Sequence, residues 1–387
     1  MRILIDGRPL LEAQPTGVSR YARHLLDALF ALPEAREHEF IVYTNSASAA
    51  MTARAPQWSY AHVRSLHTRY PNKLLHAGIV LTGRPTIDTL VRRAGGGTVD
   101  AVIALNPHFL SVTPGIPFFL TIHDVSMQIA PDLFSLRARL WHRAVNLPRL
   151  LQQATHVFSV SESTRTDLQT YFGVASQHST TISPAAPPLP THNCEPTCVF
   201  AHTNEPSILM IGTREKRKNI LGALTAFELV LRQLPTARLI LLGTAGYGWD
   251  EAQQFLDNHP EVSSRVQILG FADEATKSAA IAHATICLYP SWYEGFGIPL
   301  LEAFAAGVPV ITSYGSALAE TAGDAALFAL PWRPDMLADT IHTLLTDSAL
   351  QNEMRARGFA RARAFDWSDS ARLLLTSVLQ QTESPTQ

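Results

Sequence analysis

The chain has 387 residues, of which 46% are hydrophobic and 17% charged, and its formal net charge is −2. This length exceeds one ordinary hydrophobic core and predicts two domains, and the composition excludes a disordered chain. The near-zero net charge gives no reason to expect nucleic acid as a partner. Residues 1–183 nevertheless carry 17 Lys and Arg against 12 Asp and Glu, so the two halves are expected to meet different partners.

The first half of the chain reads as strands that alternate with helices. Tyr21, Leu25 and Leu29 recur at helical spacing and predict a helix after the first loop. Strands alternating with helices favour a parallel sheet that is covered on both faces. Runs of apolar residues predict buried strands at residues 2–6, 40–43, 101–105, 118–122 and 157–160.

Cysteine usage and the N-terminus both indicate a cytoplasmic protein. An odd, low number of cysteines (Cys194, Cys198 and Cys287) suits a reducing compartment. Cys194 and Cys198 would supply half of a zinc site, but no second Cys or His pair has suitable spacing, so no metal is expected. Residues 1–11 lack the apolar core of a signal peptide, and no apolar run spans a bilayer. We expect a soluble protein or one bound peripherally to the inner face of the membrane.

Prolines between residues 184 and 190 interrupt the alternation, because they cannot continue a helix or an interior strand. We interpret residues 184–206 as a linker. It would join a first domain, residues 1–183, to a second, residues 207–365, and residues 366–387 would form a helix that crosses back to the first domain and a tail. In the second domain, strands are predicted at residues 207–211, 238–242, 266–269, 285–289 and 308–312, and helices at residues 220–233 and 299–306.

A glycine-rich loop follows the strand at residues 285–289, and Pro299 suits the start of the next helix. Ligands of open α/β sheets bind at the carboxyl ends of strands, and a helix N-terminus favours an anion such as a diphosphate. Glu294 precedes the turn and Glu302 lies about one turn inside the helix. Hydrogen bonds to sugar and ribose hydroxyls would explain two carboxylates at an anion site. The alternatives are that Glu294 is a solvated loop charge and that Glu302 is an ordinary surface residue of the helix.

The stretch from Glu294 to Ile311 resembles the E-x7-E signature of the retaining glycosyltransferases of family 4, in their mannosyltransferase-like branch. The resemblance implies the GT-B fold, in which two doubly wound Rossmann-like α/β domains face a cleft. It implies that Glu302 holds the donor ribose and that Glu294 is a catalytic residue beside the donor sugar. The donor phosphates would be approached by the backbone amides of Phe296, Gly297 and Ile298.

The loop that begins at Gly212 resembles the family loop in which an Arg and a Lys grip the diphosphate. Lys218 corresponds to the Lys, whereas Thr213 stands where many relatives carry the Arg. Either Arg217 or Arg214 would take that place, and Arg217 is favoured. Such cations would stabilise the charge on a leaving nucleoside diphosphate. A solvated basic loop is the alternative.

Three further residues are assigned by the same resemblance. His123 follows a strand and corresponds to the catalytic residue that reaches the donor sugar from the opposite domain, with a structural histidine as the alternative. Gly17 lies in the first loop and would allow close approach of the donor. Phe271 lies in the loop that corresponds to the lining of the nucleobase.

Residues 54–93 are strongly basic, since their Lys and Arg side chains are opposed only by Asp88. In the family the first domain binds the acceptor. The basic segment therefore suits a pyrophosphate-linked lipid acceptor or peripheral contact with an anionic membrane. A solvated cationic loop is the alternative.

The absence of an Asp-x-Asp motif and the Arg/Lys clamp indicate metal-independent transfer without a bound cofactor. The resemblance implies retention of anomeric configuration, and since no carboxylate nucleophile can be nominated, departure and attack on the same face are favoured. GDP-mannose is the favoured donor, ahead of a UDP-hexose or a deoxysugar nucleotide, and the acceptor would be a glycan or lipid-linked oligosaccharide of surface polysaccharide synthesis. A nucleotide-sugar 2-epimerase and a non-catalytic nucleotide- or glycan-binding subunit are the alternatives. No G-x-G-x-x-G follows a strand, which disfavours a dehydrogenase.

Overall fold

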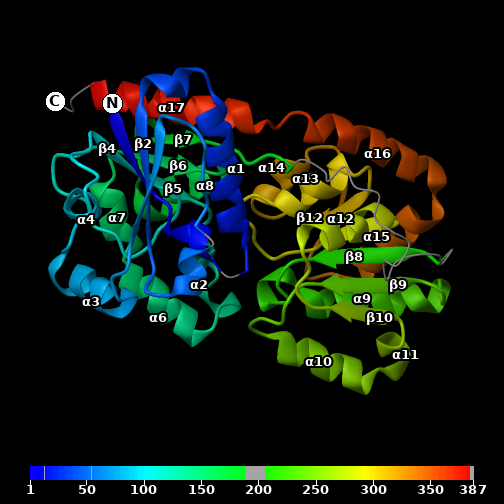
Figure 1. Cartoon of the computed structure of the whole chain (residues 1–387). Helices are drawn as coiled ribbons and strands as arrows, with labels where there is room; N and C mark the ends of the chain where they lie inside the picture. Colours follow the sequence, from blue (N-terminus) through cyan, green and yellow to red (C-terminus); the bar gives the residue numbers. More distant parts are fainter. Residues whose placement is uncertain (13, 54, 188–204, 384–387) are drawn as a thin grey trace. The chain divides into compact units, whose positions relative to one another are not determined.

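The computed structural model describes residues 1–12, 14–53, 55–187 and 205–383. The chain forms two compact units (Figure 1). Met1–Gln128, Leu136–Pro184 and the described residues from Asp366 onward make up the first, whereas Ile129–Ser135 and the described residues of Ala185–Phe365 make up the second. Most of the predicted linker, residues 184–206, lies outside the described residues, as do Cys194 and Cys198.

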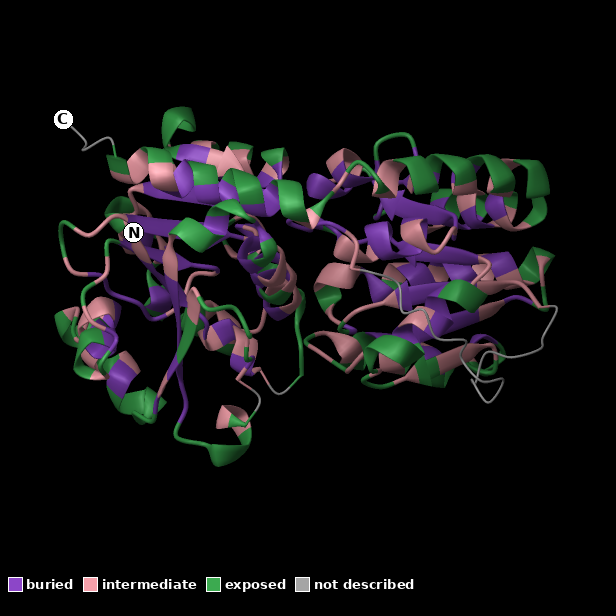
Figure 2. Ribbon diagram, turned by 45° about the horizontal axis from the view of Figure 1, so that its top comes forward, coloured by how far each residue is buried: buried purple, intermediate pink, exposed green. Residues whose placement is uncertain are grey.

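The first unit is built on a seven-stranded parallel sheet in the order β3-β2-β1-β4-β5-β6-β7. Its central strands are buried along almost their whole length, which explains why their sequences are nearly all apolar (Figure 2). The strands are β1 (Arg2–Asp6), β2 (Glu39–Asn45), β3 (Val63–Thr68), β4 (Ala101–Ala104), β5 (Phe118–Ile122), β6 (His156–Ser159) and β7 (Ser179–Thr181).

The helices of the first unit fill the connections between these strands. Helix α1 (Gly17–Ala31) begins with a capping box, in which Thr16 and Ser19 each accept a hydrogen bond from the other's backbone N–H. The C-terminal helix α17 (Trp367–Glu383) packs against α1 within the same unit. The others are α2 (Ala49–Thr52), α3 (Asn72–Thr82), α4 (Ile87–Arg93), α5 (Ser126–Ile129), α6 (Leu136–Val145), α7 (Leu147–Gln153) and α8 (Glu162–Phe172).

The second unit is built on a six-stranded parallel sheet in the order β10-β9-β8-β11-β12-β13. Apolar side chains of the sheet pack with those of α9 (Ile220–Gln233) and α15 (Pro334–Thr346) in one buried core. The remaining elements are β8 (Ser207–Ile211), β9 (Arg238–Leu242), α10 (Trp249–Asn258), α11 (Pro260–Ser263), β10 (Val266–Leu269), α12 (Glu274–His283), β11 (Ile286–Tyr289), α13 (Ile298–Ala305), β12 (Val310–Ser313), α14 (Ala317–Ala322), β13 (Ala326–Ala329) and α16 (Ser348–Ala362).

The predicted class of two doubly wound, Rossmann-like α/β sheets is confirmed. The sequence did not reveal strands β3, β7 and β13, all of which lie at sheet edges. An edge strand is covered less completely than a central one, so it need not be a continuous apolar run. In β3, for example, Arg64 and Ser65 are exposed.

The strand order reverses once in each sheet, between β1 and β4 in the first and between β8 and β11 in the second. Ligands of open α/β sheets bind outside the carboxyl ends of the strands at such reversals. In the described ranges, no helix combines the length and the apolar character that crossing a bilayer requires.

Candidate functional site

Two loops meet at the reversal of the second sheet. One follows β8 and carries residues 212–219, and the other follows β11 and carries residues 290–297 before α13 begins. The backbone N–H of Trp292 donates to the carbonyl oxygen of Arg217 at 2.9 Å. This bond joins the two loops, which are far apart in sequence, into one site.

A buried cluster of charges occupies this site. The Glu294 carboxylate accepts hydrogen bonds from Lys218 Nζ at 2.5 Å and from Arg217 Nη1 at 2.7 Å. Arg217 also pairs with Glu215 at 2.8 Å, and Lys218 Nζ donates to the Tyr289 hydroxyl. The side chains of Lys218 and Glu294 are only 11% and 9% exposed. Carboxylates therefore hold both cations of the predicted clamp, and the sequence did not show this pairing.

Burial and charge oppose each other in the ionisation of this cluster. Burial acts to raise the pKa of Glu294, but the positive charges of Arg217 and Lys218 outweigh it and lower that pKa to about 2. Burial also lowers the pKa of Lys218, against the attraction of Glu294. At neutral pH Glu294 is thus an ionised carboxylate, which can accept hydrogen bonds and cannot donate them.

Two hydroxyl groups hold the loop that carries Glu294. The backbone N–H of Glu294 donates to Ser316 Oγ at 2.9 Å, and Thr321 Oγ1 donates to the carbonyl oxygen of Phe296 at 2.6 Å. Ser316 itself has φ 56° and ψ −149°, a conformation that non-glycine residues adopt only under strain. Strained residues of this kind cluster at active sites and ligand clamps, which makes this loop a candidate binding loop.

Helix α13 points its N-terminus into the same loop. Gly297 caps it with φ 104°, and a Cβ there would lie 2.8 Å from Leu318 Cδ2, so only glycine fits. Ile298 is the first helical residue, and Phe296 beside the cap is buried. The first amides of a helix have no partner within it, and the helix dipole favours an anion there.

Glu302 lies in α13 and is only 3% exposed. This burial excludes the alternative that Glu302 is an ordinary surface residue. Its Oε1 lies 2.6 Å from Nζ of Lys277 on α12, which also pairs with Glu274 at 2.9 Å. Sequence reasoning missed Lys277 as a partner of Glu302, because a lysine in a helix is normally solvated. Its position among the buried Ala280 and Ile281 was the available signal.

The structure separates the two arginines that the sequence left open. The Arg217 guanidinium contacts Glu294 directly, whereas the Arg214 guanidinium lies 4.2 Å from the centre of the Trp249 ring. Arg217 therefore belongs to the charge cluster and Arg214 packs against α10.

The other predicted donor residues of the second unit lie in the loop after β8 and in the loop after β10. Gly212 has φ 125°, and a Cβ there would lie 3.4 Å from Cε of Lys218. Thr213 is exposed, and Phe271 is 50% exposed between β10 and α12. Among the residues that the structure describes, no three His, Cys, Asp or Glu side chains gather as metal ligands.

His123 and Gly17 belong to the first unit. Nε2 of His123 donates to the Leu105 carbonyl oxygen at 2.8 Å if the neutral ring carries its proton there, and burial lowers the pKa of the ring. A Cβ at Gly17 would meet no atom within 4 Å, so nothing in the surrounding protein requires glycine there. The contacts of these two residues with a donor stay predictions.

Comparison with known proteins covers both units. Residues 15–188 match the family model "Glycosyltransferase Family 4", and residues 199–361 match "Glycosyl transferases group 1". The chain is 31% identical over 255 residues to O-antigen chain mannosyltransferase B of Escherichia coli, covering 64% of this chain and 66% of the relative. It is 30% identical over 172 residues to phosphatidyl-myo-inositol mannosyltransferase of Mycobacterium tuberculosis, covering 42% and 44%. The matches thus span just under two thirds and under half of these relatives.

Solved structures agree with the fold. Sucrose-phosphate synthase from Thermosynechococcus elongatus superposes with a TM-score of 0.71 over 98% of both chains, at 20% sequence identity. This likeness extends over both units and confirms the predicted GT-B fold. On the two family models together, the chain belongs to glycosyltransferase family 4.

Proposed function

We propose that this protein is a retaining hexosyltransferase. It would move a sugar, with mannose favoured, from a nucleotide-sugar to a glycan or lipid-linked acceptor in surface polysaccharide synthesis. The observation that carries the proposal is the ionised Glu294, held by Lys218 and Arg217 beside the N-terminus of α13. The names of the mannosyltransferase relatives support the choice of mannose.

In this proposal the site binds the donor through its diphosphate and its hydroxyls. The N-terminal amides of α13 and a further N–H of Lys218 bind the diphosphate, since an ammonium group has three donors. Glu294 accepts hydrogen bonds from donor-sugar hydroxyls and Glu302 from the ribose. Arg217 holds Glu294 in place and adds positive charge beside the leaving group.

Transfer would proceed on one face of the sugar. The bond between the anomeric carbon and the diphosphate oxygen breaks, and a bond from the acceptor oxygen to that carbon forms on the same face. The acceptor hydroxyl gives its proton to the departing diphosphate, so no protein base is required. Exclusion of water would limit hydrolysis of the donor.

Binding of the nucleotide tests this proposal without an acceptor. We expect GDP and GDP-mannose to raise the melting temperature of the full chain more than UDP, dTDP or ADP and their sugars. A ligand at about 100 times its Kd adds about 2.7 kcal/mol of stability. Stabilisation by UDP alone would replace mannose with another hexose, and no stabilisation by any nucleotide would contradict the proposal.

Lys218→Ala should weaken GDP binding about tenfold or more, because a hydrogen bond to a charged group contributes about 1.5–3 kcal/mol. Lys216→Ala is the matched control, since Lys216 is an exposed lysine of the same loop. Equal GDP affinity of the two variants in calorimetric titration would rule out the role of Lys218.

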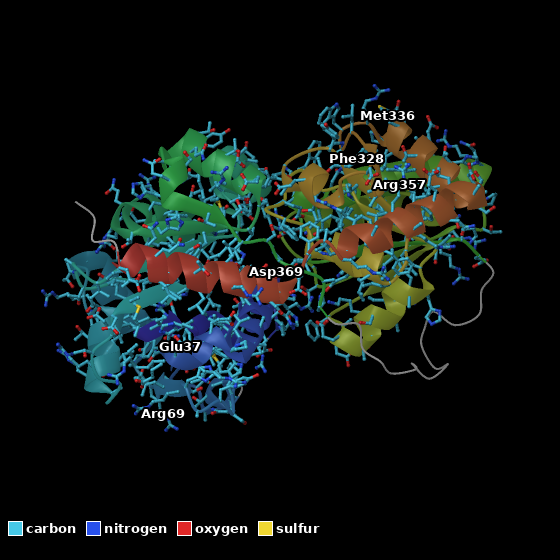
Figure 3. All side chains as sticks on the ribbon, turned by 90° about the horizontal axis from the view of Figure 1, so that it is seen from above. Glu37, Arg69, Phe328, Met336, Arg357 and Asp369 are labelled. Atoms are coloured by element: carbon cyan, nitrogen blue, oxygen red, sulfur yellow. The ribbon has the colours of Figure 1, made fainter. Side chains whose placement is uncertain are left out.

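We also propose a cytoplasmic location with peripheral contact between the basic residues 54–93 and the inner face of the membrane. Arg64, Arg69 and Lys73 of this segment are exposed, and Figure 3 shows Arg69 at the outside of the first unit. A cationic surface of this kind suits anionic lipid and a pyrophosphate-linked acceptor.

A further inference from the structure

Helix α3 of the first unit leaves large apolar side chains in solvent. Leu75 and Ile79 face the core, but Leu74 and Leu81 are 72% and 81% exposed, and Val80 is exposed as well. Leu74 and Leu81 are seven residues apart, so they lie on the same face of the helix. A single exposed leucine needs no explanation, whereas two on one face of one helix do.

Helix α6 shows the same property. Leu136 and Leu140 are 67% and 58% exposed, and Trp141 is exposed too. The two leucines are four residues apart and share one face. Val145 is the buried residue of this helix, so most of α6 lies at the surface.

The two helices are neighbours within the first unit. Phe109 stacks on His76 of α3 with ring centres 4.6 Å apart, and Trp141 of α6 meets the same Phe109 edge-on at 5.7 Å. A Cβ at Gly83, the residue that caps α3, would lie 2.8 Å from Nη2 of Arg149, which follows α6 in the chain. These contacts place α3 and α6 beside one another, so their exposed side chains lie on neighbouring parts of the surface of the first unit.

This surface is basic as well as apolar. Neither residues 72–85 nor residues 136–149 contain an acidic residue. The exposed basic side chains of the two segments are Lys73, Arg84, Arg137 and Arg143. A partner must therefore offer negative charge at its surface and apolar material beneath it. An anionic lipid bilayer has this arrangement, since headgroups attract Lys and Arg while Leu and Trp enter the acyl boundary.

We propose that α3 and α6 together form a membrane-insertion surface, with Leu74, Leu81, Leu136, Leu140 and Trp141 entering an anionic bilayer. The inference deepens the proposed function. It rests on that function because a lipid-linked acceptor requires the enzyme to act at the membrane. It adds α6, which lies outside the basic residues 54–93, and it makes apolar insertion rather than charge alone the basis of binding. Binding to vesicles needs no nucleotide, so its failure and the failure of the donor site are separate results.

Vesicle sedimentation of the full chain tests this surface. Wild type should bind phosphatidylcholine vesicles that contain phosphatidylglycerol, and should bind pure phosphatidylcholine far less. Leu81→Glu with Leu140→Glu should weaken binding at least tenfold, because inserting each leucine is worth more than the 1.4 kcal/mol of a tenfold change. Leu373→Glu on α17, another exposed leucine of the first unit, should bind like wild type. Unaltered binding by the double variant, or no binding by wild type, overturns the proposal.

Two more measurements separate insertion from other causes. Brominated lipids should quench part of the tryptophan fluorescence of wild type, and Trp141→Phe should remove that part. The three leucines changed to glutamate are exposed, so the melting temperature of those variants should stay unchanged. If the double variant instead converts a dimer to a monomer and keeps its vesicle binding, the surface is a contact between copies and the proposal is wrong.

Discussion

Glu294→Gln is expected to lower the rate of sugar transfer by a factor of about 10² to 10³, the usual cost of losing one preorganised electrostatic contact in a transition state. Glutamine keeps the shape of the side chain and removes its charge. It cannot hold both Lys218 and Arg217 as the carboxylate does, and it accepts weaker hydrogen bonds from the donor sugar. The measurement is the initial rate of nucleoside diphosphate release.

Glu215→Gln is the control for this change, because Glu215 pairs with the same Arg217 but is 24% exposed. We expect its rate to stay within about tenfold of wild type, since partly exposed ion pairs contribute little. Equal losses in the two variants would mean that Arg217, rather than Glu294, is the group that matters.

Glu294→Gln should also change how the stability of the folded protein depends on pH. The pKa of Glu294 falls from its ordinary 4.5 to about 2 in the folded protein. Its stabilising effect is therefore complete above about pH 4.5 and is lost as the pH falls towards 2. The shift corresponds to about 3 kcal/mol, less the cost of burying Lys218. Urea unfolding should show wild type more stable than Glu294→Gln at pH 7, with the difference shrinking at pH 3; a constant difference would contradict this.

Lys277→Met is expected to destabilise the second unit by about 3–5 kcal/mol, because it leaves the carboxylate of Glu302 buried without its partner. That loss should lower the melting temperature by roughly 10 °C. Adding Glu302→Gln removes the unpaired charge, so the double variant should recover most of the stability. Glu274→Gln is the control, since this second partner of Lys277 is 56% exposed and should cost at most about 1 kcal/mol.

The double variant also separates a structural role from a binding role. If Lys277 positions Glu302 for the donor ribose, wild type should bind GDP more tightly than its 2′- and 3′-deoxy analogues. The stable double variant should have lost that preference in calorimetric titration. A preference equal to that of wild type would show that the ion pair serves folding alone.

The central strands could be predicted because burial on both faces demands uninterrupted apolar residues, as in the strands that became β5 and β9. Three of the four edge strands could not, because a strand such as β3 places Arg64 and Ser65 in solvent, whereas the edge strand β10 was predicted at residues 266–269. The start of β12 lies two residues later than predicted for a related reason. Pro309 cannot donate a hydrogen bond in a strand, and β12 begins after it, at Val310.

Much of the site could be anticipated from the loops that carry it, but not its pairing. Lys218 and Glu294 are 76 positions apart, and only the order of strands β8 and β11 brings them to 2.5 Å. The sequence suggested two cations that grip a diphosphate, and it did not show that carboxylates hold both of them. The pairing of Lys277 with Glu302 could not be predicted, because the sequence alone does not show that a helical lysine is 4% exposed.

The most direct test is to follow nucleotide-sugars by NMR with the full chain and a lipid extract as the source of acceptor. We predict release of GDP from GDP-mannose and incorporation of α-linked mannose into the lipid fraction by wild type, and both reactions slowed by a factor of about 10² to 10³ with Glu294→Gln. Formation of a 2-epimer of the sugar would identify an epimerase instead. A donor that binds but stays intact would identify a binding subunit, and either result would contradict the proposed transfer.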